Sequence, residues 1–255
     1  MFREEMDMAV KAAEGKNNLL KNNPVGYFLA SMLAGMYVGF GILLIFTIGG
    51  MLNGQPYVKV VMGASFGIAL SLVVIAGAEL FTGNNMVMTL GVLDKKVSLG
   101  QTIKLWVVCF IGNLVGSILL AVLFWKAGLA AGPVKDFIET ATAAKMGLGA
   151  GELFIRGILC NILVCLAIWS GFRSKSESGK LIMIFWCLFA FITTGFEHSV
   201  ANMTLLTIGL LTSSDAAISL SGYAHNLIYV TLGNMVGGIL FVAVPYFVIS
   251  KNKLK

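Results

Sequence analysis

Charged residues are scarce in this chain. Only 12% of its 255 residues are Asp, Glu, Lys or Arg, whereas 58% are hydrophobic and the mean hydropathy is +0.89. Soluble domains carry about 25% charged residues, so this chain cannot cover a water-facing surface. The composition excludes a soluble protein and predicts an integral membrane protein in contact with the lipid bilayer. We expect no nucleic-acid partner, because the net charge of +6 is better explained by membrane topology.

Residues that bind metals or form disulfides are equally scarce. The four cysteines lie in apolar runs without a Cys-x-x-Cys pair, and there are two histidines. We therefore expect buried thiols, with no cofactor and no metal. A membrane enzyme using Glu197 and His198 would need a nucleophile or a metal beside them, and the His-Glu-x-x-His spacing is missing. The sequence does not favour an enzyme.

The hydrophobic residues fall into six long stretches. Crossing a bilayer takes about 20 mostly apolar residues, and the candidates are residues 25–50, 58–91, 101–127, 152–172, 181–211 and 223–249. The second and fifth are too long for one span, so each is predicted to be a half-helix, an irregular piece and another half-helix. Residues 1–23 are predicted to form an amphipathic helix on the cytoplasmic face, and residues 128–151 a glycine- and alanine-rich loop.

Two polar stretches interrupt the long spans and resemble each other. Gly195–Met203 holds Glu197 and His198, and charged groups at membrane depth normally mark a functional site. Gly77–Met86 has the same Gly-x-Glu opening and the same Asn-Met close, and is one residue longer. Interrupted spans in matching positions of two halves indicate a transport site.

A second motif extends this internal repeat. Gly112–Gly116 in the third span is echoed by Gly233–Gly237 in the sixth. Because three spans per half is an odd number, the second half must enter the membrane upside down. The sequence thus predicts a single transmembrane domain over residues 1–255, built as a 3+3 inverted repeat of residues 25–127 and 152–249.

Basic residues predict the orientation in the membrane. Thirteen of the eighteen fall on one side of the predicted spans, and that side is expected to be cytoplasmic, with both termini inside. The thirteen are Arg3, Lys11, Lys16, Lys21, Lys95, Lys96, Lys104, Arg173, Lys175, Lys180, Lys251, Lys253 and Lys255.

Four parts of the sequence resemble the formate/nitrite transporter family, and its hydrosulfide-conducting members most closely. They are Gly77–Met86, Arg156–Asn161, Gly195–Met203 and Lys145. The resemblance implies an all-α, aquaporin-like fold and a homopentamer in the cell inner membrane with one pore per protomer. It also implies a pore lined by Thr82, His198, Lys145 and Asn161. A cytoplasmic constriction would consist of Phe66, Leu70 and Leu80, and a periplasmic one of Val164 and Phe191.

The polar residues at the breaks have alternative interpretations. His198 is either a proton-exchanging group in the pore or a satisfied buried histidine. Thr82 can donate to an anion or to His198, and can also cap the following half-helix. Glu79 and Glu197 are interpreted as structural, accepting hydrogen bonds from backbone N–H groups freed at the breaks. Asn161 fits a solute contact and a helix contact equally well.

The functional prediction is a channel for small monovalent anions. Hydrosulfide is placed first, with formate and nitrite close behind, and His198 is expected to exchange a proton with the anion. The alternatives are a proton-coupled formate/nitrite carrier and an aquaporin-like channel for neutral solutes. Aquaporins pair two Asn-Pro-Ala turns, and neither break here contains proline.

Overall fold

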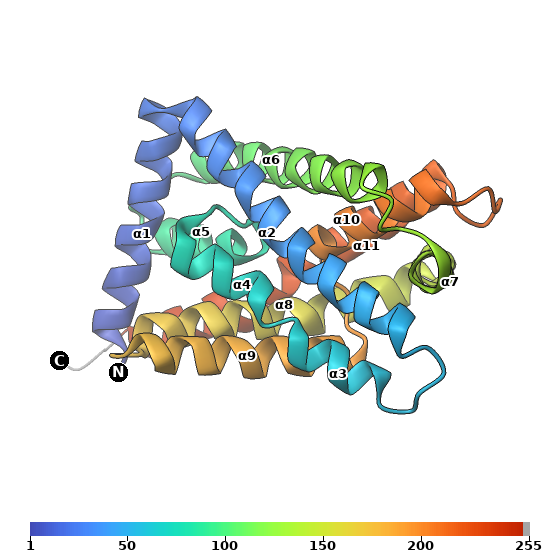
Figure 1. The fold of residues 1–255 in the computed structure, drawn as a ribbon. Coiled ribbons are helices and arrows are strands. Elements are labelled where there is room, and N and C mark those ends of the chain that lie inside the picture. The colour runs from blue at the N-terminus through green and yellow to red at the C-terminus, as the bar shows by residue number, and fades with distance from the viewer. Residues whose placement is uncertain (252–255) are drawn as a thin grey trace.

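The computed structural model describes residues 1–251, and these residues form helices without a strand (Figure 1). In chain order the elements are α1 (Arg3–Asn22), α2 (Pro24–Met51), α3 (Val58–Ser65), α4 (Ile68–Leu72), the π-helix η1 (Val73–Gly77), α5 (Phe81–Leu93), α6 (Leu99–Lys126), α7 (Gly132–Met146), α8 (Ala150–Arg173), α9 (Glu177–Thr194), α10 (Ser199–Thr212), α11 (Leu220–Gly238), the π-helix η2 (Ile239–Ala243) and α12 (Val244–Ser250).

Six helical segments in residues 1–251 are long and apolar enough to cross a membrane, which confirms the predicted number of spans. They are Pro24–Met51, Val58–Gly77, Leu99–Lys126, Ala150–Arg173, Glu177–Thr194 and Leu220–Ser250. The second and fifth stop early, as predicted for broken helices. Each is followed by a short extended connection and a shorter helix, α5 or α10, whose residues are almost all buried.

The two halves of the chain repeat the same order of elements. Each half has an amphipathic or short helix, a long span, a broken span, a buried half-helix and another long span. The half-helices lie toward opposite ends of the bundle: α5 packs against α1, and α10 packs against α7 (Figure 1). The repeat is therefore inverted, and it includes α7 as the counterpart of α1.

The prediction of a loop over residues 128–151 is wrong, because most of it forms α7. Pro133 lies in the first turn, where its missing N–H costs no hydrogen bond, and alanines favour the helix that follows. Ile138, Thr142 and Met146 recur every four residues and bury one face against the bundle. Sequence analysis gave weight to the glycines at the ends and overlooked this spacing.

Glycines let the long spans approach closely within each half. A side chain on Gly116 of α6 would run into the Met32 carbonyl of α2, and one on Gly233 of α11 would run into the Phe154 carbonyl of α8. Small residues at helix crossings permit such backbone contact. The α2–α6 and α8–α11 pairs thus form equivalent walls around the half-helices.

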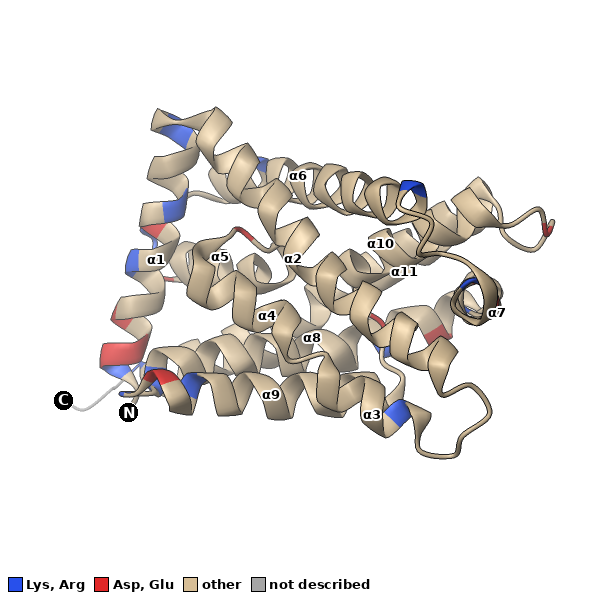
Figure 2. Cartoon of the chain, in the orientation of Figure 1, with Lys and Arg blue, Asp and Glu red and all other residues tan. Residues whose placement is uncertain are grey.

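Basic residues gather at one end of the bundle. Figure 2 shows most Lys and Arg residues around α1 and the neighbouring helix ends, with fewer at the end that carries α3 and α7. The N-terminus and α12 both lie on the basic side, where the Phe2 and Tyr246 rings are 5.8 Å apart.

We predict that Gly116→Ala destabilises the protein, whereas Gly100→Ala in the same helix does not. The first substitution places a methyl group against the Met32 carbonyl, and nothing lies within 4 Å of the second. Overpacking costs about 1–3 kcal/mol, so the melting temperature of the purified protein should fall by roughly 3–10 °C. Equal melting temperatures for the two variants would contradict this packing.

Candidate functional site

Both breaks begin at a glycine with a left-handed backbone. Gly77 has φ +81° and Gly195 has φ +80°, values that residues with a side chain rarely adopt. The chain then runs extended until the half-helices begin at Phe81 and Ser199. These turns let the chain reverse its local direction at membrane depth without a proline.

An asparagine from the following long span closes each break. Asn113 accepts a hydrogen bond from the Phe81 amide (2.9 Å) and donates to the Glu79 carbonyl (2.9 Å). Asn234 accepts from the Ser199 amide (2.9 Å) and donates to the Glu197 carbonyl (2.9 Å). Backbone groups freed by a broken helix must be satisfied inside the protein, since lipid offers no partner. The two asparagines meet that requirement.

The glutamate of each break accepts from side chains and not from backbone amides. Lys16 of α1 donates to both Glu79 carboxylate oxygens at 2.8 Å, and Lys145 of α7 donates to Glu197 at 2.6 Å. The expectation of backbone N–H donors is therefore wrong. The Phe81 and Ser199 amides are already bonded to the asparagines, and the Glu79 and Glu197 amides to carbonyls of α2 and α8, which leaves the carboxylates to neutralise lysines.

A second asparagine completes each cluster. The Asn84 amide donates to Glu79 (2.9 Å) and the Asn202 amide donates to Glu197 (2.6 Å), each from five residues further along the chain. Only 3% of the Glu197 side chain is exposed. A charge buried this deeply is tolerated when it is paired and fully hydrogen-bonded, and these contacts meet that condition.

These contacts correct the alignment of the two breaks. Because Asn84 and Asn202 make the same contact in their own halves, they are equivalent positions. The two stretches therefore align without the extra residue that the sequence comparison introduced. The counterpart of His198 is then Leu80, and not Thr82. Both Leu80 and His198 are the residues that precede a half-helix. The imidazole thus occurs in one half only.

Thr82 and His198 nevertheless meet at the centre of the bundle. Thr82 lies in the first turn of α5, and its Oγ1 is 2.9 Å from His198 Nε2. The Ala201 amide donates to His198 Nδ1 (3.1 Å), so that nitrogen carries no proton. In the neutral ring the proton is therefore on Nε2, which donates to Thr82. The Thr82 hydroxyl remains free to donate to something else.

A narrow apolar space, which we call the neck, lies on the His198 side of this hydrogen bond. Thr82 itself is fully buried and is not one of its lining residues. The volume of the neck is about 10 Å³, about the minimum that one water molecule requires. Around His198 it is lined by the five predicted constriction residues together with Val38, Ala69 and Leu188; the five are Phe66, Leu70, Leu80, Val164 and Phe191. The Phe66 and Phe191 rings pack edge to face at 5.6 Å.

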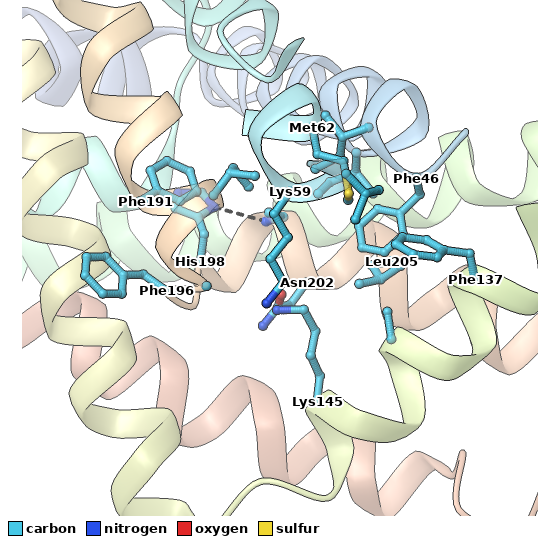
Figure 3. A pocket seen from close by; sticks show the side chains of 17 residues that line it. Phe46, Lys59, Met62, Phe137, Lys145, Phe191, Phe196, His198, Asn202 and Leu205 are labelled. Atoms are coloured by element: carbon cyan, nitrogen blue, oxygen red, sulfur yellow. Dashed lines mark hydrogen bonds between the residues drawn. The ribbon is translucent and has the colours of Figure 1, made fainter. Parts of the chain in front are cut away.

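A larger chamber opens from the neck toward α7. This α7 chamber has a volume of about 260 Å³ and shares Phe191 and His198 with the neck. Its walls are mostly aliphatic and aromatic, and Lys59 and Lys145 reach into it from opposite sides (Figure 3). Of the predicted pore residues, Lys145 and His198 lie here.

A second chamber lies toward α1, on the other side of the neck. This α1 chamber measures about 470 Å³ and shares Leu80 with the neck. Lys16, Glu79 and Asn84 supply its polar lining. The protein therefore has two lysine-bearing chambers with a neck between them, and the neck is lined by one imidazole that is bonded to the buried Thr82 hydroxyl.

Comparison with known proteins identifies the family. Residues 3–248 match the formate/nitrite transporters. This chain belongs to the formate/nitrite transporter family. Nitrite transporter NirC of Salmonella typhimurium is 44% identical over 249 residues, which cover 97% of this chain and 91% of that protein. As a family member the protein is a multi-pass membrane transporter or channel for small anions and not an enzyme.

Two solved structures share its fold. An "FNT family ion channel" matches with a TM-score of 0.93 at 43% identity, covering 96% of this chain and 98% of the other. A "pentameric formate channel with formate bound" matches with a TM-score of 0.80 at 30% identity, covering 91% and 99%.

Asn161 contacts neighbouring helices in this family member. Its fully buried amide donates to the Asn234 carbonyl (2.7 Å) and to the Thr82 carbonyl (3.2 Å), and it lines neither chamber nor the neck. Of the two interpretations, the structure shows the helix contact. Asn161 thereby supports Thr82 from behind.

Several site residues escaped the sequence analysis. Lys16 is counted there only among the charges that predict topology. Asn113 and Asn234 are included only as parts of the repeated glycine motif, although their recurrence at matching positions was a usable signal. Lys59 carried no signal, because a lone lysine near a span end is usually solvated. Only the fold shows that the Lys59 side chain lines the α7 chamber.

Ser65 lies in the Gly-x-Ser-x-Gly spacing of some hydrolases, over Gly63–Gly67, which the sequence analysis overlooked. In hydrolases the serine lies on a sharp turn between a strand and a helix. Here it ends α3, and its hydroxyl donates to the Val61 carbonyl at 2.9 Å. The spacing therefore carries no hydrolase site.

We predict that Lys145→Met destabilises the protein by leaving the buried Glu197 carboxylate without a positive charge beside it. Breaking a buried pair costs about 3–5 kcal/mol, whereas the double variant Lys145→Met/Glu197→Gln should recover most of the loss. Lys135→Met breaks the more exposed pair with Glu139 (3.7 Å) and should cost less than about 1 kcal/mol. Thermal unfolding measures all three. If Lys145→Met were as stable as Lys135→Met, the result would contradict the ion pair between Lys145 and Glu197.

Proposed function

We propose that this protein lets small monovalent anions, nitrite and formate first, cross the cell inner membrane through a pore in each protomer of a homopentamer. The matched relatives whose names state a solute or an assembly support this assignment: a nitrite transporter and a pentameric formate channel. Basic residues around α1 support a cytoplasmic α1 chamber and cytoplasmic termini.

One observation carries the proposal: His198 lines the neck and bonds to the buried Thr82 hydroxyl, between two chambers that each present a lysine. Lysines raise the local concentration of anions by focusing the field in a low-dielectric cleft. In the neck an anion loses water, and desolvating a charge without replacement hydrogen bonds costs many kcal/mol. A small anion that separates Thr82 from His198 receives a hydrogen bond from each.

The cap on α10 favours hydrogen bonding over proton exchange at His198. An anion that took the Nε2 proton would leave an imidazolate unless Nδ1 gained a proton, and Nδ1 accepts from the Ala201 amide. Proton exchange requires this cap to open first. We therefore assign His198 the role of a donor, and proton exchange becomes the alternative that the flux experiment tests.

Hydrosulfide, which the sequence placed first, moves behind nitrite and formate. Its single sulfur atom must accept both hydrogen bonds, whereas nitrite and formate can present a separate oxygen to each donor. A neutral-solute channel is disfavoured because both chambers present lysines, and a neutral solute gains little from them.

We predict that liposomes containing the wild-type protein take up nitrite and formate much faster than protein-free liposomes, and glycerol no faster. Hydrosulfide uptake is measured in the same way, and every solute is compared at two pH values. Anion uptake equal to that of protein-free liposomes would contradict the proposed function, and preferential glycerol uptake would indicate a neutral-solute channel.

We predict that His198→Gln keeps nitrite flux within about tenfold of wild type, whereas His198→Phe loses most of it. Glutamine supplies an N–H near the Nε2 position and cannot titrate, so it preserves donation alone. Uptake in liposomes at the same two pH values measures this. Equal loss in both variants would contradict the donor role and favour proton exchange.

A further inference from the structure

We propose that the α7 chamber binds apolar monocarboxylates, of which benzoate is the simplest aromatic example, and that a bound molecule blocks the neck. The chamber holds about 260 Å³, whereas the neck holds about 10 Å³. A molecule with an aromatic ring can therefore enter the chamber and cannot pass beyond it. This inference goes beyond the transport of small anions.

The walls of the chamber suit an apolar body. Phe46 and Phe137 lie side by side with ring centroids 5.7 Å apart, and Phe191 stacks on His198 at 5.9 Å. The other apolar lining residues come from α2, α3, α7, α9 and α10, among them Ile45 and Leu205. Nitrite and formate gain little from such walls, whereas an aromatic ring gains by removing their surface from water. Pockets with apolar walls and a few convergent polar groups are the usual form of small-molecule sites.

The charged side chains of the chamber favour a ligand with one negative charge. Lys145 is already paired with Glu197, whereas Lys59 forms no ion pair within residues 1–251. One uncompensated ammonium group thus faces an apolar space, and a carboxylate can pair with it while its ring lies against the walls. In Figure 3 the Lys59 side chain points into the chamber from the side opposite to Lys145.

The α1 chamber lacks this combination. Its Lys16 is paired with Glu79, and that carboxylate lines the same space. Phe172 is its one aromatic residue. An aromatic carboxylate should therefore bind from the α7 side and not from the α1 side.

A molecule bound in the α7 chamber blocks the neck because the two spaces share lining residues. Phe191 and His198 line both the α7 chamber and the neck. A ring packed against Phe191 covers the passage to His198, so an occupant and a permeating anion exclude each other.

Binding of 4-fluorobenzoate to the full-length protein in lipid nanodiscs, followed by fluorine NMR, tests the proposal without any transport assay. We expect saturable binding that empty nanodiscs do not show, and much weaker binding of the neutral isostere 4-fluorobenzamide. Equal binding of the two compounds, or no binding above that of empty nanodiscs, would overturn the proposal.

Two variants locate the site. Lys59→Gln should weaken 4-fluorobenzoate binding about fivefold at low salt, whereas Lys126→Gln, which removes an exposed lysine over the Trp125 ring, should leave binding unchanged. Ala141→Phe fills the chamber from α7 and should abolish binding. Full binding in Ala141→Phe, or an equal effect of the two lysine substitutions, would overturn the assignment.

A flux measurement then tests block separately from the proposed function. In membrane vesicles of defined orientation, benzoate added on the α7 side should inhibit initial nitrite uptake, and benzamide should not. If the wild type conducts no anion, the proposed function fails while the binding result still stands. If it conducts nitrite and bound benzoate does not inhibit it, the block is overturned.

Discussion

An interrupted helix inside a membrane must satisfy the backbone groups that it frees, and the rest of this structure depends on that constraint. Each break uses one asparagine from a neighbouring span, Asn113 or Asn234, to bond both the amide and the carbonyl on either side of the turn. Lipid cannot replace these partners. The position of each half-helix is thereby tied to the span beside it, and both half-helices are held toward the centre of the bundle.

The glutamates extend this support to the mouths of the pathway. Glu79 and Glu197 connect the breaks to lysines on α1 and α7, the helices that precede the first span of each half. The same contacts bring a positive charge beside each chamber and neutralise a carboxylate that would otherwise repel anions. The ion pairs therefore support the breaks and remove the repulsion of anions by the carboxylates, and Lys59, which forms no ion pair within residues 1–251, adds the charge that makes the two chambers unequal.

Much of the fold could be predicted from residue patterns, because membrane spans are long and apolar and because the breaks carry charged residues that lipid disfavours. The number of spans, both breaks and the meeting of Thr82 with His198 followed from those patterns. The contacts between distant segments could not be predicted from these patterns. The partners of Glu79 and Glu197, the helical state of α7 and the match of His198 with Leu80 depend on which chain segments lie side by side. A one-residue offset between Asn84 and Asn85 was enough to misalign the breaks.

The central claim is that the end of α10 fixes His198 as a hydrogen-bond donor in the neck. Nitrogen-15 NMR of the full-length protein in lipid bilayers tests it most directly, with His225→Gln leaving His198 as the sole imidazole. The account predicts a neutral ring at neutral pH with the proton on Nε2 and none on Nδ1. A proton on Nδ1, alone or together with one on Nε2, would contradict it.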